Sequence, residues 1–171
     1  MSQWKLQIND LKKIDDIVQE LRSSFSYSTQ LRNVAYLIQL DEFLSQLTGH
    51  LDKGMKVVYK HNLLRMRADI LEGLLYCSLK DIDKLPKPHN RKKPGLQAYA
   101  NKAKGVGIIS TNTHKQIAKI CTGRDNFHPP KQEVLFTNEA VSDPIFRISD
   151  SILNITLANI KKYFEKIHAT I

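Results

Sequence analysis

The chain has 171 residues, of which 42% are hydrophobic and 25% charged, and its formal net charge is +9. This composition predicts one soluble globular domain over residues 1–171, with a core of its own. It excludes a membrane-spanning protein, because no apolar run approaches the roughly 18 residues that cross a bilayer; residues 1–10 also lack the pattern of a signal peptide.

Two amphipathic helices are expected in the first third of the chain. Asn9 or Asp10 would cap the first, whose apolar residues recur over 11–25 at spacings of three and four. The second would cover residues 30–51, with a stripe of leucines along one face.

The third helix has the clearest pattern. Its apolar stripe covers residues 57–82, and a second apolar face joins it in the middle of that run. A helix that is apolar on two sides belongs in the centre of a bundle or at a dimer interface. Glu72 lies within this apolar zone and is either a partly exposed acid or a carboxylate that pairs with Arg124.

Positive charge is concentrated after this helix. From Lys84 to Lys104 there are seven lysines and arginines and no acid, which accounts for +7 of the net charge. Prolines and glycines exclude one long helix, so residues 84–107 are predicted to form a long basic insertion loop. With Tyr99 as a stacking ring, such a loop suits a nucleic-acid backbone; the alternative is a solvated loop that binds nothing. The candidate RNA-binding cations are Lys87, Arg91, Lys92, Lys93, Lys102 and Lys104.

Two further helices complete the chain. The fourth is expected over about 110–128, with Thr111 or Asn112 as its cap, and the last from Ser142 to about Ile167. Five amphipathic runs and almost no alternating segments predict an all-α, up-and-down helical bundle of about five helices, with the basic loop between the third and the fourth.

Arg124 and His128 continue the apolar face of the fourth helix onto its last turns. A bare guanidinium is costly to bury, so this position predicts a wet cleft, a subunit interface or an anion site. Pro129 would end the helix near His128, where the helix dipole favours the protonated imidazole. The pair suits a phosphate; the alternative is a helix end in which both side chains cap backbone carbonyls.

Motifs for other chemistries are missing from the sequence. It has no phosphate-binding Walker loop, no dinucleotide fingerprint and no Gly-x-Ser-x-Gly. The histidines are scattered and Cys77 and Cys121 stand alone, so we expect neither a metal nor a cofactor. Two lone cysteines also fit a reducing, cytoplasmic setting.

Three features resemble the HEPN superfamily, small helical bundles found in toxin–antitoxin and defence systems. Residues 70–79 (ILEGLLYCSL) are similar to the LEGLL helix of that family, and residues 124–129 (RDNFHP) to its arginine-polar-x-x-histidine-proline signature. The isoleucine-rich run 145–167 lies where the family has its last helix. The resemblance covers about 30–167, with the basic loop as an insertion; many members have asparagine where this chain has Asp125.

This resemblance implies a metal-independent endoribonuclease that acts as a homodimer, with two copies of the motif in one composite cleft. His128 would be the general acid or base, and Arg124 would bind phosphate oxygens. Asp125 or Asn126 would orient this pair, and Glu72 would set the direction of Arg124. The implied partners are RNA, a second copy of the chain and a cognate antitoxin protein.

Two other interpretations stay open. The first is a non-catalytic HEPN-like module that dimerises and binds nucleic acid, a nucleotide or a partner protein through the same cleft. The second is a helical interaction protein whose basic loop binds any acidic surface. Exposure of Arg124 and His128 in a shared groove would favour catalysis over the first. Loss of nucleic-acid binding on deletion of residues 86–104, with binding intact in Arg124→Ala, would favour the second.

Overall fold

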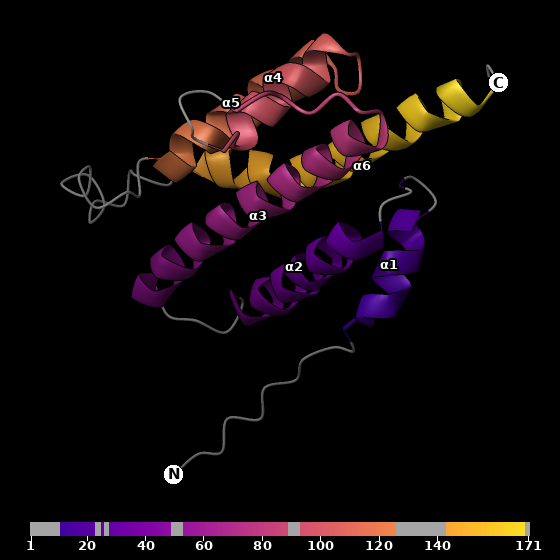
Figure 1. The fold of residues 1–171 in the computed structure, drawn as a ribbon. Helices are drawn as coiled ribbons and strands as arrows, with labels where there is room; N and C mark the ends of the chain where they lie inside the picture. The colour runs from indigo at the N-terminus through magenta and orange to yellow at the C-terminus, as the bar shows by residue number, and fades with distance from the viewer. Residues whose placement is uncertain are drawn as a thin grey trace.

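The computed structural model describes residues 11–22, 25, 28–48, 53–88, 93–125 and 143–169. Within these residues the protein is all-α, as predicted. Its helices are α1 (Ile14–Arg22), α2 (Ser28–Thr48), α3 (Lys53–Asp81), α4 (Leu96–Gly105), α5 (Thr111–Asp125) and α6 (Asp143–His168) (Figure 1). The expected count of about five helices omitted α4.

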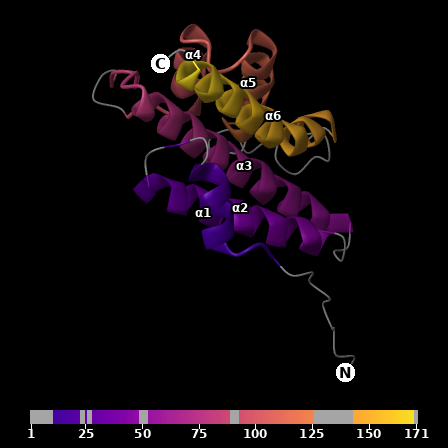
Figure 2. The same ribbon diagram turned by 90° about the vertical axis from the view of Figure 1, so that its right-hand side faces the viewer.

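Helix α3 is the centre of the structure. It packs against α2 on one side and against α4, α5 and α6 on the other, while α1 packs on α2; Figures 1 and 2 show this order from two directions. Apolar residues recur on more than one face of α3, so the helix is stable only when it is covered on several sides. Its largest fully buried side chains are Leu63, Leu64, Ile70, Leu71, Leu74, Leu75 and Leu79.

Gly73 allows the close approach of α2 and α3. A Cβ atom at this position would lie 2.7 Å from Cγ2 of Val34 on α2. Valine has one strongly preferred rotamer in a helix, so this methyl group has little room to move aside. The glycine in the LEGLL-like run is therefore explained by helix packing.

We expect Gly73→Ala to be less stable than Gly105→Ala by about 1–3 kcal/mol, the usual cost of overpacking a core. Both changes replace a helical glycine, but a Cβ at Gly105 would meet nothing within 4 Å. The comparison therefore accounts for part of the gain in helix propensity, since Gly73 lies within α3 and Gly105 ends α4. Urea unfolding of the two variants measures the difference, and equal stabilities would contradict this account of Gly73.

Helix α1 begins later than the sequence pattern suggested. Its first turn starts at Ile14, where the amide N–H groups of Asp16 and Ile17 bond to the carbonyl of Lys13. The predicted start at Leu11 was wrong, because the first helical hydrogen bonds are accepted by Lys13 and residues 11–13 lie outside the helix. Beyond α1, the ring of Phe25 meets that of Phe164 on α6 edge-on, with the ring centroids 6.4 Å apart.

Helix α4 corrects the prediction of one long loop over 84–107. Its buried side is formed by Leu96, Tyr99, Ala100 and Ala103, which recur at helical spacing. Two of these residues are alanines, so the apolar signal in the sequence is weak. The first turn also depends on a distant group, because Oε2 of Glu72 on α3 accepts the backbone N–H of Leu96 at 2.9 Å.

The end of α4 is a Schellman turn. The N–H of Ile108 bonds to the carbonyl of Ala103 at 2.9 Å, and that of Gly107 to the carbonyl of Lys104 at 3.1 Å. Gly107 has φ of 85°, the left-handed conformation that glycine adopts without strain. The chain then turns directly into α5, and Nε2 of His114 on α5 lies 2.7 Å from Oδ1 of Asn101 on α4.

A buried polar network joins α3 to both of its neighbouring layers. Arg67 is only 3% exposed, and its Nε donates to Oδ1 of Asp41 on α2 at 2.8 Å. Its two terminal nitrogens donate to the hydroxyls of Ser45 on α2 and Ser149 on α6, each at 3.2 Å. One side chain thus links three helices in the interior.

Helices α5 and α6 run antiparallel to each other. Near the start of α5, Oγ1 of Thr113 accepts a bond from Nδ2 of Asn159 at 3.4 Å, whereas near its end Gly123 faces Ile145. The cap of α5 is Ser110, whose hydroxyl accepts the N–H of Thr113 at 3.1 Å, and not the predicted Thr111 or Asn112. Among the described residues, no helix has the length and apolar character that crossing a bilayer requires.

Candidate nucleic-acid interface and ligand pocket

The predicted Arg124–His128 site lies mostly outside the described part of the chain. Arg124 and Asp125 belong to the last turn of α5, but the structure does not describe their side chains. Asn126 and His128 lie wholly outside the described residues. What the structure does define is the base of this site. A Cβ at Gly123 would lie 3.2 Å from Leu64 and 3.3 Å from Ile145, so α3, α5 and α6 meet at the residue before Arg124.

Glu72 has a structural task in addition to its predicted catalytic one. Its carboxylate is half-buried and accepts the N–H of Leu96, which holds the start of α4 against α3. This bond satisfies one of the free amide groups at a helix start. The predicted pairing with Arg124 involves a side chain outside the described residues and stays a prediction.

Replacement of Glu72 separates these two tasks. We expect Glu72→Ala to lower the free energy of unfolding by about 1 kcal/mol, the usual cost of losing an N-terminal cap. Glu72→Gln keeps an oxygen acceptor and should lose less. Urea unfolding measures both values, and RNA cleavage by Glu72→Gln shows whether the negative charge is needed to orient Arg124.

The predicted RNA-binding cations divide into two groups. Lys87 and Lys93 are exposed in the connection between α3 and α4, whereas Lys102 and Lys104 lie on the last turns of α4, half-buried and exposed respectively. Arg91 and Lys92 fall outside the described residues. The structure therefore places part of the expected binding loop on a rigid helix.

Tyr99 is not the stacking ring that the sequence suggested. It is 8% exposed and packs edge-on against Tyr76 of α3, with the ring centroids 5.8 Å apart. Burial raises the pKa of its hydroxyl, and the neighbouring Glu72 and Tyr76 raise it further. The prediction was wrong because a tyrosine in a basic segment was taken as surface, whereas it belongs to the buried side of α4.

The acid-free segment is longer than the predicted loop. From Lys84 to Arg124 the chain has ten lysines and arginines and no aspartate or glutamate, whereas residues 1–83 have eleven of each sign. Lys115 and Lys119 extend it onto α5, where both are exposed and lie one turn apart on the same face. The excess positive charge of the protein thus belongs to the segment 84–124, half of it in the connection that precedes α4 and half on α4 and α5.

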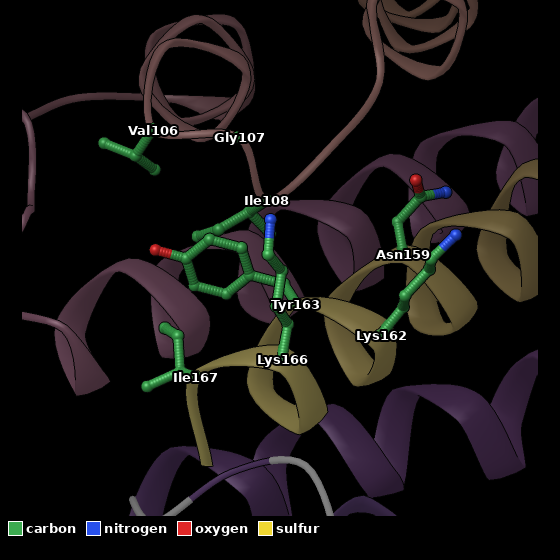
Figure 3. Close-up of a pocket in the computed structure, with 8 residues that line it drawn as sticks. All are labelled: Val106, Gly107, Ile108, Asn159, Lys162, Tyr163, Lys166 and Ile167. Atoms are coloured by element: carbon green, nitrogen blue, oxygen red, sulfur yellow. The ribbon is translucent and has the colours of Figure 1, made fainter. Parts of the chain in front are cut away.

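A pocket of about 630 Å³ opens between the layer formed by α4 and α5 and the end of α6, and we call it the α6 pocket (Figure 3). Val106, Gly107 and Ile108 of the Schellman turn form one wall. The other wall is one face of α6, formed by Asn159, Lys162, Tyr163, Lys166 and Ile167. Such a volume is typical of small-molecule sites, and among the described residues its charged lining consists of Lys162 and Lys166.

The sequence of α6 contains a pattern typical of a binding face, but the prediction rested only on the isoleucine-rich stripe of this helix. Asn159, Lys162, Tyr163 and Lys166 recur at spacings of three and one, which places them on one side of α6. That side mixes polar, charged and aromatic residues, as binding surfaces often do. The opposing wall comes from a turn more than fifty residues earlier, so the concavity itself could not be predicted.

Both cysteines are buried, and the thiol of Cys77 is protonated at neutral pH. Cys77 is fully buried on α3, and burial, followed by the nearby Asp81, raises the pKa of its thiol to about 12. Cys121 is 6% exposed. Within the described ranges, no three His, Cys, Asp or Glu side chains gather as a metal-binding group would.

Comparisons of the chain with protein-family models, with curated proteins and with solved structures found no match.

Proposed function

We propose that this protein binds RNA through the α4–α5 layer and cleaves it at the end of α5, as a metal-independent endoribonuclease of the HEPN kind. The observation that supports binding most strongly is the run of ten cations without an acid from Lys84 to Arg124. Lysines and arginines bind a nucleic acid by neutralising its phosphates and releasing counterions. The end of this same run carries Arg124 on the last turn of α5.

The proposed reaction needs only groups that this segment supplies. The 2′-hydroxyl of a ribose attacks the adjacent phosphorus and loses its proton to a base, while the 5′-oxygen leaves and takes a proton from an acid. His128 serves as acid or base because an imidazole titrates near neutral pH. Arg124 stabilises the charged phosphorane by bidentate bonds, and Asp125 or Asn126 orients the two side chains.

A homodimer completes the proposed site. Two copies of residues 124–128 would face each other in one cleft, and a cognate antitoxin protein in the cytoplasm would be the natural regulator of such an activity. Both follow from the HEPN resemblance, which residues 70–79 and 124–129 carry.

A second candidate is an RNA-binding module of the same shape without catalysis. It is favoured by Asp125, whose carboxylate follows Arg124 directly and would partly neutralise the guanidinium. This candidate predicts the same RNA binding through α4 and α5, with no cleavage.

The binding part of the proposal is tested on α5. We expect Lys115→Gln/Lys119→Gln to weaken RNA binding and to reduce the slope of log K against log salt by about 1.4, at roughly 0.7 for each lost phosphate contact with single strands. The matched control is Lys12→Gln/Lys13→Gln, which removes two exposed lysines ahead of α1. Equal slopes for both double variants, measured by fluorescence anisotropy, would contradict binding through this layer.

A further inference from the structure

The α6 pocket lies far from the proposed cleavage site. It is bounded by the turn that leads into α5, whereas Arg124 is at the other end of that helix. From Thr111 to Arg124 the helix rises roughly 20 Å at 1.5 Å per residue. A ligand in this pocket therefore occupies a site of its own.

We infer that the α6 pocket binds one nucleotide unit, with the base against Tyr163 and the phosphate at Lys162 and Lys166. The inference deepens the proposed function, and it rests on that function only for RNA as the source of the nucleotide. Its observations are the shape, charge and aromatic wall of the pocket.

The charge of the pocket selects an anion. Lys162 and Lys166 are exposed and lie one turn apart on α6. Lys166 extends toward Ile108 and Lys162 beside Asn159 (Figure 3), and no acid is among the described lining residues. The carbonyl end of α4 is close by, but its carbonyls at Lys102, Ala103 and Lys104 already accept bonds from the following turn. The ammonium groups of the two lysines therefore make the electrostatic potential of the pocket positive, and two such cations suit a phosphate.

The remaining wall selects a flat, partly apolar body. The ring of Tyr163 is half-buried, and its edge-on contact with Phe164, with the centroids 5.6 Å apart, holds it in place. Ile108, Val106 and Ile167 complete the apolar surface. Aromatic side chains with neighbouring cations are the usual platform for bases of single strands.

Asn159 adds a group that can read the edge of a base. Its Nδ2 donates to the carbonyl of Ile155 at 2.6 Å and to Thr113 at 3.4 Å. Because these bonds occupy the amide nitrogen, the side chain offers its oxygen to a ligand. An amide oxygen accepts from the exocyclic amino groups or ring N–H of a base.

The source of the nucleotide follows from the charge around the pocket. Lys115 and Lys119 lie along α5 between the turn that lines the pocket and Arg124, so cations for further phosphates are near the pocket. The pocket would then hold a nucleotide a few positions away from the scissile phosphate, so the substrate is single-stranded RNA. A free mononucleotide has the same chemistry, and the experiment distinguishes the two sources.

The test measures binding of a short fluorescein-labelled oligouridylate and oligoadenylate to His128→Ala protein, in which cleavage does not deplete the probe. Tyr163→Ala should weaken binding at least about fivefold, the lower end of base–aromatic stacking, whereas Tyr163→Phe keeps the ring and should stay within about twofold. Lys162→Gln/Lys166→Gln removes the contacts to one phosphate and should reduce the salt slope by about 0.7. The control Lys161→Gln removes an exposed lysine of the same helix outside the pocket and should change neither value.

The sources are separated by competition with AMP and UMP. If AMP or UMP displaces the probe from the parent pocket but not from Tyr163→Ala, the pocket is assigned to free nucleotides. If the variants bind the oligonucleotide less tightly but neither mononucleotide displaces it, the pocket is assigned to the RNA strand. Either result supports a nucleotide site. Folded Tyr163→Ala and Lys162→Gln/Lys166→Gln proteins that bind every probe as tightly as the Lys161→Gln control overturn it, even if the parent cleaves RNA. If the parent does not cleave RNA but these variants lose binding, the cleavage proposal falls and the pocket stands.

Discussion

His128→Ala should lower the rate of RNA cleavage by about two to four orders of magnitude, the usual contribution of a general acid or base. The imidazole has this effect because the attacking 2′-hydroxyl and the leaving 5′-oxygen each need a proton transfer, and no other group within 124–128 titrates near neutral pH. RNA affinity should change much less, since binding depends on the cations of α4 and α5. Single-turnover cleavage and anisotropy separate the two quantities.

The matched control for this prediction is His168→Ala, which removes an exposed histidine from the last turn of α6. Arg124→Ala, compared with Arg147→Ala on the exposed side of α6, tests the second member of the pair in the same way. A His128→Ala protein that cuts RNA as fast as the His168→Ala control would leave the non-catalytic module as the better account.

Arg67→Ala should destabilise the fold by about 3 kcal/mol, at the low end for the loss of one member of a buried ion pair. The guanidinium is 3% exposed, and its three nitrogens donate hydrogen bonds to Asp41, Ser45 and Ser149. The side chain of Asp41 is 16% exposed, so water can solvate part of the charge left behind. For a chain of this size, such a loss lowers Tm by roughly 6–12 °C.

Arg65→Ala is the control, since Arg65 is exposed on the same helix and is also an arginine. It should change stability by no more than about 0.5 kcal/mol. Arg67→Met/Asp41→Leu should recover part of the loss, because an apolar pair of similar volume avoids burying one charge alone. If Arg67→Ala and Arg65→Ala unfold at the same urea concentration, the network does not stabilise the fold.

The sequence predicted those elements whose signal is local. The long apolar stripe of α3 correctly indicated a central helix, because its leucines recur over many turns and must be covered on several sides. Helix α4 escaped prediction since half of its buried side is alanine and its first turn is capped by Glu72, twenty-four residues earlier in the chain. Tyr99 was predicted to be a surface ring because the helix whose buried side it belongs to was not predicted.

Side-chain environments that several helices create together could not be predicted. Arg67 lies one turn before Ile70 on an apolar side of α3, but it was not singled out from the sequence, and its partners come from α2 and α6. The α6 pocket likewise needs the turn at Gly107 to face α6. At the predicted site the structure places Arg124 and Asp125 on the last turn of α5, and the roles of these residues and of His128 remain a proposal.

The most direct test of RNA cleavage by this protein is an analysis of reaction products. The parent protein is incubated, in the presence of a metal chelator, with a single-stranded RNA and with the DNA strand of the same sequence. We expect the RNA to be shortened into fragments that end in 2′,3′-cyclic phosphates and begin with 5′-hydroxyls, while the DNA, which lacks the attacking hydroxyl, stays intact. RNA that remains at full length, or a DNA strand that is cut equally fast, would contradict the account.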